Sequence, residues 1–165
     1  MTDTQATAVS TSIVVDAPVE RAFAVYTEDI GSWWPREHHI IQAPLSHMVF
    51  EPREGGCVYD VGTDGSECRW ARVLAYEPPH RVVFSWDISL QWQLETDPAK
   101  TSEVEVRFIP EGTARTRVEL EHRHLDRHGE GWEGMRDAVG SPDGWGTGLR
   151  NFAHLLQEER VGGTA

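Results

Sequence analysis

Residues 102–122 read SEVEVRFIPEGTARTRVELEH and contain two runs of alternating side chains, 102–109 and 115–122, joined by a turn at Gly112. In each run, apolar positions alternate with charged ones. The side chains expected on the apolar face are Val104, Val106, Phe108, Val118, Leu120 and His122. Such alternation places one face of a strand pair against a core and the other in water, which is typical of an antiparallel sheet.

Earlier segments continue this pattern. Their β-branched and aromatic content, bounded by turn residues, predicts strands. The predicted strands are 10–15, 46–52, 56–62, 67–77 and 80–87. Apolar residues at helical spacing after Pro18, and the following segment 28–35, predict two short helices between the first two strands. Segment 88–101 is ambiguous, because Ile88, Leu90, Trp92 and Leu94 alternate but Asp97-Pro98 breaks the run. Segment 123–140 is polar and glycine-rich and is not assigned to one type of element.

A long helix is predicted over about 142–159. Ser141 is a suitable N-cap, and Pro142 suits the first helical position. The apolar stripe that follows comprises Trp145, Leu149, Phe152, Leu155 and Leu156. This spacing gives the helix one face that must be buried.

Together these elements predict an α+β fold, in which a curved antiparallel sheet of six to seven strands wraps around the C-terminal helix, with two short helices after the first strand. The predicted organisation is one domain at 10–160, with tails at 1–9 and 161–165. A sandwich of seven short strands is the alternative. The helix pair and the apolar final helix argue against it. A curved sheet over one helix often leaves a cavity that suits a ligand.

Composition excludes several classes of partner. Among 165 residues, 27 are acidic and 15 basic, so the net charge of −12 argues against binding to nucleic acid or an anionic membrane surface. The sequence contains no apolar run long enough to insert into a membrane and no signal peptide, which predicts a cytoplasmic protein. With Asp64-Gly65 as a two-residue hairpin turn, Cys57 is predicted to face Arg72 and Cys68 to face Val61. The two cysteines are then offset and should remain free thiols.

A set of short motifs occurs in a fixed order along residues 10–158. They are Asp16-Ala17-Pro18-x-Glu20-Arg21-Ala22-Phe23, Trp33-Trp34-Pro35, Pro52-Arg53-x-Gly55-Gly56, Val73-x-x-Tyr76-x-Pro78-Pro79-x-Arg81-Val82-Val83-Phe84-x-Trp86, Gly112-Thr113, Val118-x-Leu120-x-His122 and Gly144-Trp145-x-x-x-Leu149. In this order they resemble the START and polyketide-cyclase-like (SRPBCC) superfamily. Within it, the chain is most similar to the C-terminal domain of the activator of a heat-shock chaperone's ATPase.

The resemblance implies a helix-grip fold with a deep apolar cavity. Its members include lipid carriers, ring-closing enzymes and chaperone co-factors, and fold alone does not choose among these. The leading hypothesis is a domain that binds a small apolar or aromatic molecule without strong catalysis. The alternatives are a cyclase, dehydratase or hydrolase, and an interaction protein such as a chaperone co-factor or a regulator of the toxin–antitoxin kind. The sequence is compatible with a homodimer, and no feature supports a chaperone partner directly.

Ten residues are predicted to line the cavity, on the basis of strand alternation, the helix stripe and the tryptophan pair. They are Trp33, Trp34, Phe84, Trp86, Val118, Leu120, His122, Trp145, Leu149 and Phe152. Ordinary core packing is the competing interpretation for each tryptophan.

In the enzyme hypothesis His122 is the candidate acid or base, with Asp87 or Tyr26 as its helper. A hydrogen-bonded structural histidine is the competing interpretation. Arg53 could bind a ligand carboxylate or simply lie on the surface. The spacing of His38, His39, His122, His124 and His128 matches no zinc motif, and no phosphate loop or nucleophile elbow is present, so no metal and no cofactor are predicted.

Overall fold

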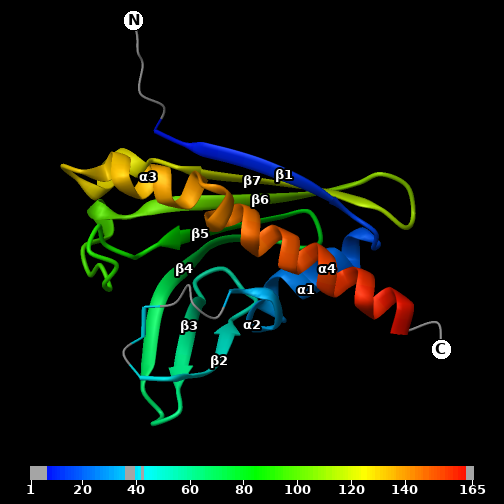
Figure 1. The fold of residues 1–165 in the computed structure, drawn as a ribbon, viewed down its shortest axis with the longest axis horizontal. Helices are drawn as coiled ribbons and strands as arrows, with labels where there is room; N and C mark the ends of the chain where they lie inside the picture. Colours follow the sequence, from blue (N-terminus) through cyan, green and yellow to red (C-terminus); the bar gives the residue numbers. More distant parts are fainter. Residues whose placement is uncertain (1–6, 36–39, 42, 163–165) are drawn as a thin grey trace, which may run out of the picture.

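The computed structural model describes residues 7–35, 40–41 and 43–162, with side chains described as far as Glu158. Seven antiparallel strands form one sheet in the order β1-β7-β6-β5-β4-β3-β2 (Figure 1). The strands are β1 (Val9–Val15), β2 (Leu45–Phe50), β3 (Cys57–Gly62), β4 (Glu67–Glu77), β5 (Arg81–Trp86), β6 (Ser102–Pro110) and β7 (Thr116–Arg123). The helices are α1 (Val19–Thr27), α2 (Ile30–Trp33), η1 (Pro98–Lys100), η2 (Leu125–His128), α3 (Trp132–Gly140), η3 (Pro142–Gly146) and α4 (Thr147–Gly162).

The alternation in β6 and β7 has the predicted structural outcome. Val104 pairs with His122, and Val106 pairs with Leu120, with all four side chains on the buried face. The opposite face carries charges, and at its centre the Glu105 carboxylate binds Arg81, Arg107 and Arg123. One side of the sheet is therefore apolar and faces the helices, as an antiparallel sheet with one wet face requires.

Curvature is concentrated in β4, the longest strand. The pairing register shifts between Val58 and Tyr59 on β3, where Trp70 of β4 is the extra residue, and it shifts again between Val73 and Ala75 of β4. A bulge bends a strand and increases its twist. Figure 1 shows β4 turning away from β5 so that β3 and β2 hang below the rest of the sheet.

The first of these bulges corrects one sequence prediction. A two-residue turn without a bulge would pair Cys68 with Val61, but the structure pairs Cys68 with Asp60. The Cys57 prediction is confirmed, because Cys57 pairs with Arg72. Both cysteines are free and half-buried.

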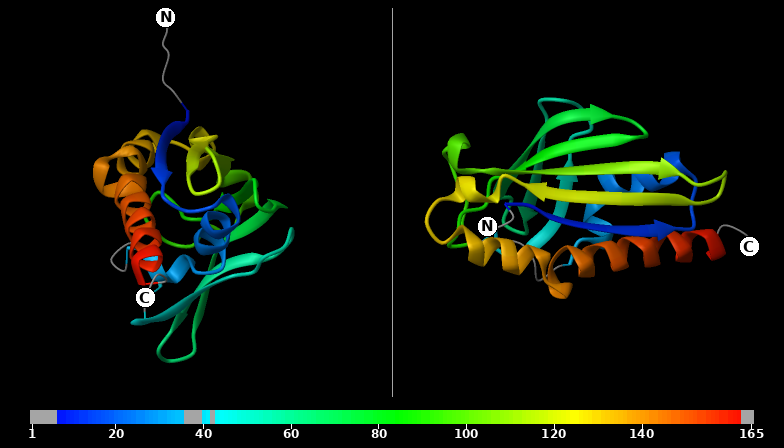
Figure 2. Two further views of the ribbon diagram at one scale, coloured as in Figure 1. Left: turned by 90° about the vertical axis from the view of Figure 1, so that its right-hand side faces the viewer. Right: turned by 90° about the horizontal axis from the view of Figure 1, so that it is seen from above.

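Helix α4 lies along the concave side of the sheet, and α1 and α2 lie beside it (Figure 2). The space between helix and sheet is packed with aromatic rings. Tyr26 contacts the rings of Phe108 and Phe152 at centroid distances of 5.6 and 5.4 Å, and both contacts are edge-to-face. Ring pairs in this geometry add stability beyond the area that they bury. The middle of the grip is thus a filled core.

Two segments that the sequence left unassigned contain regular structure. Residues 88–101 form a loop with one Ile88–Leu94 bridge and the short helix η1. Residues 123–140 contain η2 and the three-turn helix α3. The long C-terminal helix also begins differently from the prediction. Its first turn, η3, is a wide π turn with a non-helical Gly144, and the Ser141 hydroxyl donates to the Ala138 carbonyl instead of capping the helix.

No helix in the described part of the chain is both long and apolar enough to cross a membrane.

Candidate functional site

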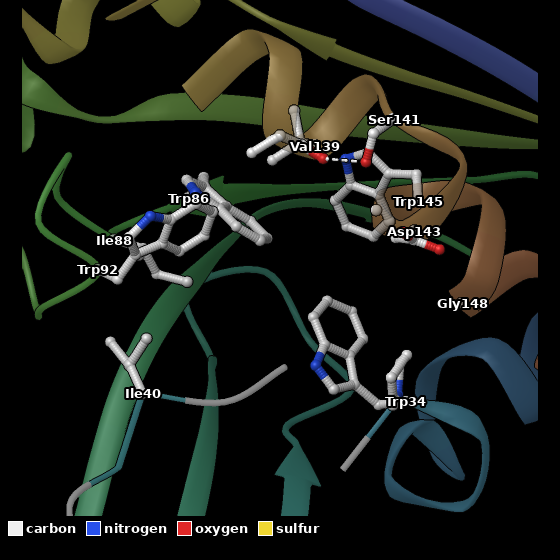
Figure 3. Close-up of a pocket in the computed structure, with 13 residues that line it drawn as sticks. Trp34, Ile40, Trp86, Ile88, Trp92, Val139, Ser141, Asp143, Trp145 and Gly148 are labelled. Atoms are coloured by element: carbon white, nitrogen blue, oxygen red, sulfur yellow. Dashed lines mark hydrogen bonds between the residues drawn. The ribbon is translucent and has the colours of Figure 1, made fainter. Parts of the chain in front are cut away.

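A cavity of about 460 Å³ opens where α3 meets α4, at one end of the grip. Its walls come from the end of α2, the end of β5 with the loop that follows, and the α3–η3–α4 junction (Figure 3). The lining residues are Trp34, Pro35, Ile40, Trp86, Ile88, Trp92, Ala138, Val139, Ser141, Asp143, Gly144, Trp145 and Gly148. The volume is in the range of sites that hold small organic ligands.

Four tryptophans dominate this lining. Figure 3 shows Trp34 approaching from one side, Trp145 from the opposite side, and Trp86 with Trp92 closing a third. The rings of Trp34 and Trp145 meet edge to face at 5.5 Å, and Trp86 lies 5.5 Å from Trp145. Indoles offer wide apolar faces, so the cavity is shaped to accept flat, apolar groups.

Two glycines allow this wall to form. A Cβ at Gly144 would lie 2.4 Å from the Val139 carbonyl oxygen, so only glycine permits the tight junction that aims Trp145 at the cavity. A Cβ at Gly148 would lie 3.3 Å from the Trp33 ring. The absence of a side chain at Gly148 therefore lets α4 approach α2 closely. Gly144 and Gly148 therefore serve close packing at the start of α4.

Trp92 stands apart from the other three. It is 45% exposed and has a backbone φ of 59°, a left-handed conformation that bulky residues rarely adopt. The loop is held by the Ser89 hydroxyl, which accepts from the N–H groups of Gln91 and Gln93, and by the Trp92 N–H, which donates to the Ser89 carbonyl. A strained residue that persists in a well-bonded loop often has a functional reason.

Polar groups are few. Ser141 uses its hydroxyl on Ala138 at 2.8 Å. The exposed Asp143 side chain makes no hydrogen bond or ion pair with any residue that the structure describes. The Trp86 Nε1–H is buried and has no partner among those same residues. A ligand would therefore meet mainly aromatic faces and one carboxylate.

Three of the ten residues predicted from the sequence line this cavity: Trp34, Trp86 and Trp145. The other seven are all buried but pack in the core beside or behind it. They are Trp33, Phe84, Val118, Leu120, His122, Leu149 and Phe152. Of the adjacent tryptophans, Trp34 faces the cavity and Trp33 packs on Tyr26, with its Nε1–H donated to the Val25 carbonyl.

His122 lies directly behind the wall. Its Nδ1 accepts from Trp145 Nε1 at 3.1 Å, and its Nε2 lies 2.7 Å from Ser102 Oγ. Complete burial, together with the nearby His128, lowers the pKa of His122 to about 3. The imidazole is therefore neutral near pH 7, and both of its nitrogens are already bound.

The other proposed proton carriers also lie away from the cavity. Asp87 forms a two-pronged ion pair with Arg72 at 3.0 and 3.1 Å. The Tyr26 hydroxyl is buried in the aromatic core, and burial raises its pKa. Arg53 lies in an exposed turn and is 3.8 Å from Glu51.

Among the described residues, no group of three or more His, Cys, Asp or Glu side chains is arranged to hold a metal ion. His38 and His39 lie outside the described residues.

Sequence reasoning missed the rest of the lining. Ile88 and Trp92 lie in the loop that was left unassigned, and Ala138 and Val139 end a helix that was not predicted. Trp92 alternates with Ile88 and Leu90 in the sequence, and that signal could have identified it. The positions of Ser141 and Asp143 depend on the π turn, for which the sequence carries no simple signal.

Comparisons with known proteins agree with this fold. Residues 16–157 match the family described as activator of Hsp90 ATPase homolog 1-like protein. No curated protein matches the chain. One similar solved structure is a complex of Txn09, an anthrahydroquino-γ-pyrone synthase, at 40% identity, covering 89% of this chain and 95% of that one with a TM-score of 0.64.

Two further similar structures come from Micromonospora echinospora. CalC, a self-sacrificing resistance protein, is 30% identical over 92% of this chain and 95% of its own, with a TM-score of 0.66. CalU16 is 25% identical over 93% of this chain and 78% of its own, with a TM-score of 0.58.

Proposed function

Because this chain belongs to the activator of Hsp90 ATPase homolog 1-like family, within the polyketide-cyclase-like SRPBCC superfamily, we propose that its cavity binds a planar aromatic small molecule between tryptophan faces. Family membership and the similar structures support ligand binding or a cyclase-type function. The observation that carries the choice of ligand is the wall of Trp34, Trp86, Trp92 and Trp145 around about 460 Å³.

The wall favours a flat ring system over an acyl chain. Aromatic faces gain from offset or edge-to-face contact with another ring, which a flexible chain cannot provide. A polycyclic aromatic molecule meets this condition. The 40% identical Txn09, named for a product of that class, supports the same choice.

The experiment is a titration with 1,8-dihydroxyanthraquinone as a flat probe and dodecanoate as an acyl-chain probe. We expect the flat probe to quench tryptophan fluorescence saturably and to raise the melting temperature, with dodecanoate weaker by at least about tenfold, or 1.4 kcal/mol. Equal binding of both probes would contradict the aromatic preference, and binding of neither would refute the function.

A second candidate is a ring-closing reaction on such a molecule. The identity to a synthase favours it. Since His122 is sealed behind Trp145, the acid or base in this reading is Asp143, the lining carboxylate. Incubation with an open-chain aromatic polyketide analogue, followed by mass spectrometry for loss of one water, tests it. Turnover that Asp143→Asn abolishes would support the reaction, and no turnover by the wild type would leave binding as the function.

An interaction role has less support from the surface. The large apolar side chains that are well exposed among the described residues are Val14, Trp92, Leu94 and Ile109. Val14 and Ile109 flank Arg117 on the charged outer face of the sheet, away from the 92–94 loop. Two separate pairs make a smaller apolar area than an interaction surface usually presents.

A further inference from the structure

A line of hydrogen-bonded side chains runs inward from the cavity wall. Trp145 Nε1 is 3.1 Å from His122 Nδ1, His122 Nε2 is 2.7 Å from Ser102 Oγ, and Ser102 Oγ is 2.8 Å from His128 Nε2. All four residues are buried, and they come from η3, β7, β6 and η2. Four polar groups placed in one apolar end of the domain are costly unless each bond is made.

The chemistry of the groups gives this line one direction. An indole N–H can only donate, so His122 Nδ1 must be the acceptor. A neutral His122 then carries its proton on Nε2 and donates to Ser102 Oγ. The Ser102 hydroxyl proton is then free to donate to His128 Nε2, which places the His128 proton on Nδ1. In this arrangement each of the three contacts joins one donor to one acceptor.

The position of the line explains how it acts on the cavity. The His122 ring lies between the two wall residues, with its centroid 5.0 Å from the Trp86 ring and 5.9 Å from the Trp145 ring. Because His122 holds the Trp145 N–H, that indole offers the cavity its ring and withholds its donor. The last atom of the line, His128 Nδ1, is buried without a partner among the described residues.

We propose that Ser102 and His128 are positioning residues of the cavity: they fix the Nε2–H tautomer of His122, whose Nδ1 holds the indole of Trp145 in the wall. The inference rests on the proposed function, since the role of the wall is to bind a flat ligand. Neither residue touches the cavity. Both act through His122.

Nitrogen NMR of histidine-labelled protein tests the direction of the line without any ligand. We expect His122 as the neutral Nε2–H tautomer and His128 as the neutral Nδ1–H tautomer. Finding His122 protonated at Nδ1, or charged near pH 7, would overturn the assignment. This measurement uses the wild type, so it holds even if a variant fails to fold.

Substitutions test the effect on the cavity. Ser102→Ala should mix the His122 tautomers, shift the Trp145 indole N–H resonance and weaken binding of 1,8-dihydroxyanthraquinone by about two- to tenfold. Ser85→Ala is the matched control, since Ser85 is an equally buried serine on the adjacent strand that serves the Arg72 N–H instead. It should lower stability and leave both the resonance and the affinity unchanged.

A second pair of variants separates hydrogen bonding from packing. His128→Gln keeps an acceptor for the Ser102 hydroxyl and should retain the affinity, whereas His128→Leu should lose it as Ser102→Ala does. Equal behaviour of Gln and Leu, or an unchanged Trp145 resonance in Ser102→Ala, would overturn the proposal. If the wild type binds no probe, the proposed function fails. The tautomers of His122 and His128 and the indole N–H resonance of Trp145 can still be measured without a ligand, and they decide this inference separately.

Discussion

Trp145 donates its indole N–H to Nδ1 of His122 at 3.1 Å, so the fully buried imidazole of His122 supports a cavity wall from behind. This contact changes the role expected of the histidine. A general acid or base must reach the substrate and exchange a proton near the working pH. His122 does neither, because the Trp145 ring separates it from the cavity and burial keeps it neutral.

The neutral His122 makes the stability of the domain depend on pH. Burial lowers its pKa to about 3 from an ordinary value of 6.5. The unfolded chain therefore takes up a proton below pH 6.5, while the folded chain does not until about pH 3. Stability should be full above pH 6.5 and should fall by about 1.4 kcal/mol per pH unit as the pH drops through this window.

Urea unfolding at several pH values between 7.5 and 4.5 measures this slope, and His122→Asn, which keeps an acceptor and a donor, should reduce it. Burial also lowers the pKa of His128, so part of the slope should remain. Burial raises the pKa of Glu105, but its arginine partners outweigh burial and lower this pKa from 4.5 to about 2. The stability that the Glu105 carboxylate contributes is therefore lost only below pH 4.5, outside the range in which the His122 slope is measured. Identical slopes in wild type and variant above pH 4.5 would contradict the buried neutral imidazole.

Trp92 should contribute to ligand affinity more than its neighbour Leu94. The two side chains are 45% and 44% exposed and lie in one loop, but only Trp92 lines the cavity. Trp92→Ala should weaken binding of 1,8-dihydroxyanthraquinone by about 1 kcal/mol, the usual value of an aromatic pair. Leu94→Ala should leave the affinity unchanged. Isothermal titration of both variants with the flat probe measures the two affinities. An equal loss of affinity in both variants would contradict a specific role of Trp92 and would indicate a general loosening of the loop.

The backbone at residue 92 predicts an inverted glycine effect. In ordinary positions glycine is about 0.5–1 kcal/mol less stable than alanine. At a φ of 59° alanine is strained and glycine is not. Trp92→Gly should therefore unfold at a higher urea concentration than Trp92→Ala. If alanine is the more stable variant, the loop has relaxed out of the left-handed region and the strain belongs to the tryptophan alone.

The fold was predictable because its signals are local. Alternation in 102–122 gave the correct face for Val104 and Leu120, and the stripe in α4 gave the correct face for Phe152. The bulge at Trp70 was not predictable, since it depends on how β3 and β4 pair over distance. A one-residue shift of this kind moved the partner of Cys68 while leaving every strand in place.

The site was harder to predict because a cavity is what packing leaves unfilled. Alternation identifies which side chains turn inward but not which of them meet another side chain there. Val118 and Leu120 turn inward and meet the core alone, whereas Trp34 and Trp145 contact each other and also line the cavity. The difference arises at the α3–α4 junction, where a π turn and a non-helical glycine set the direction of one indole.

That junction yields the last prediction. At Gly144 an added Cβ would meet two carbonyl oxygens of α3, those of Val139 at 2.4 Å and Ala138 at 2.5 Å. Gly144→Ala must therefore push α3 and α4 apart, which should cost about 1–3 kcal/mol, turn Trp145 out of the wall and weaken the flat probe. Gly134, in α3, has nothing within 4 Å of its would-be Cβ. Gly134→Ala should gain about 0.5–1 kcal/mol from helix propensity and bind normally. Thermal melts of the two variants should shift in opposite directions, and probe titrations should show weaker binding for Gly144→Ala alone. A Gly144→Ala variant as stable and as tight-binding as the wild type would show that this junction does not set the cavity.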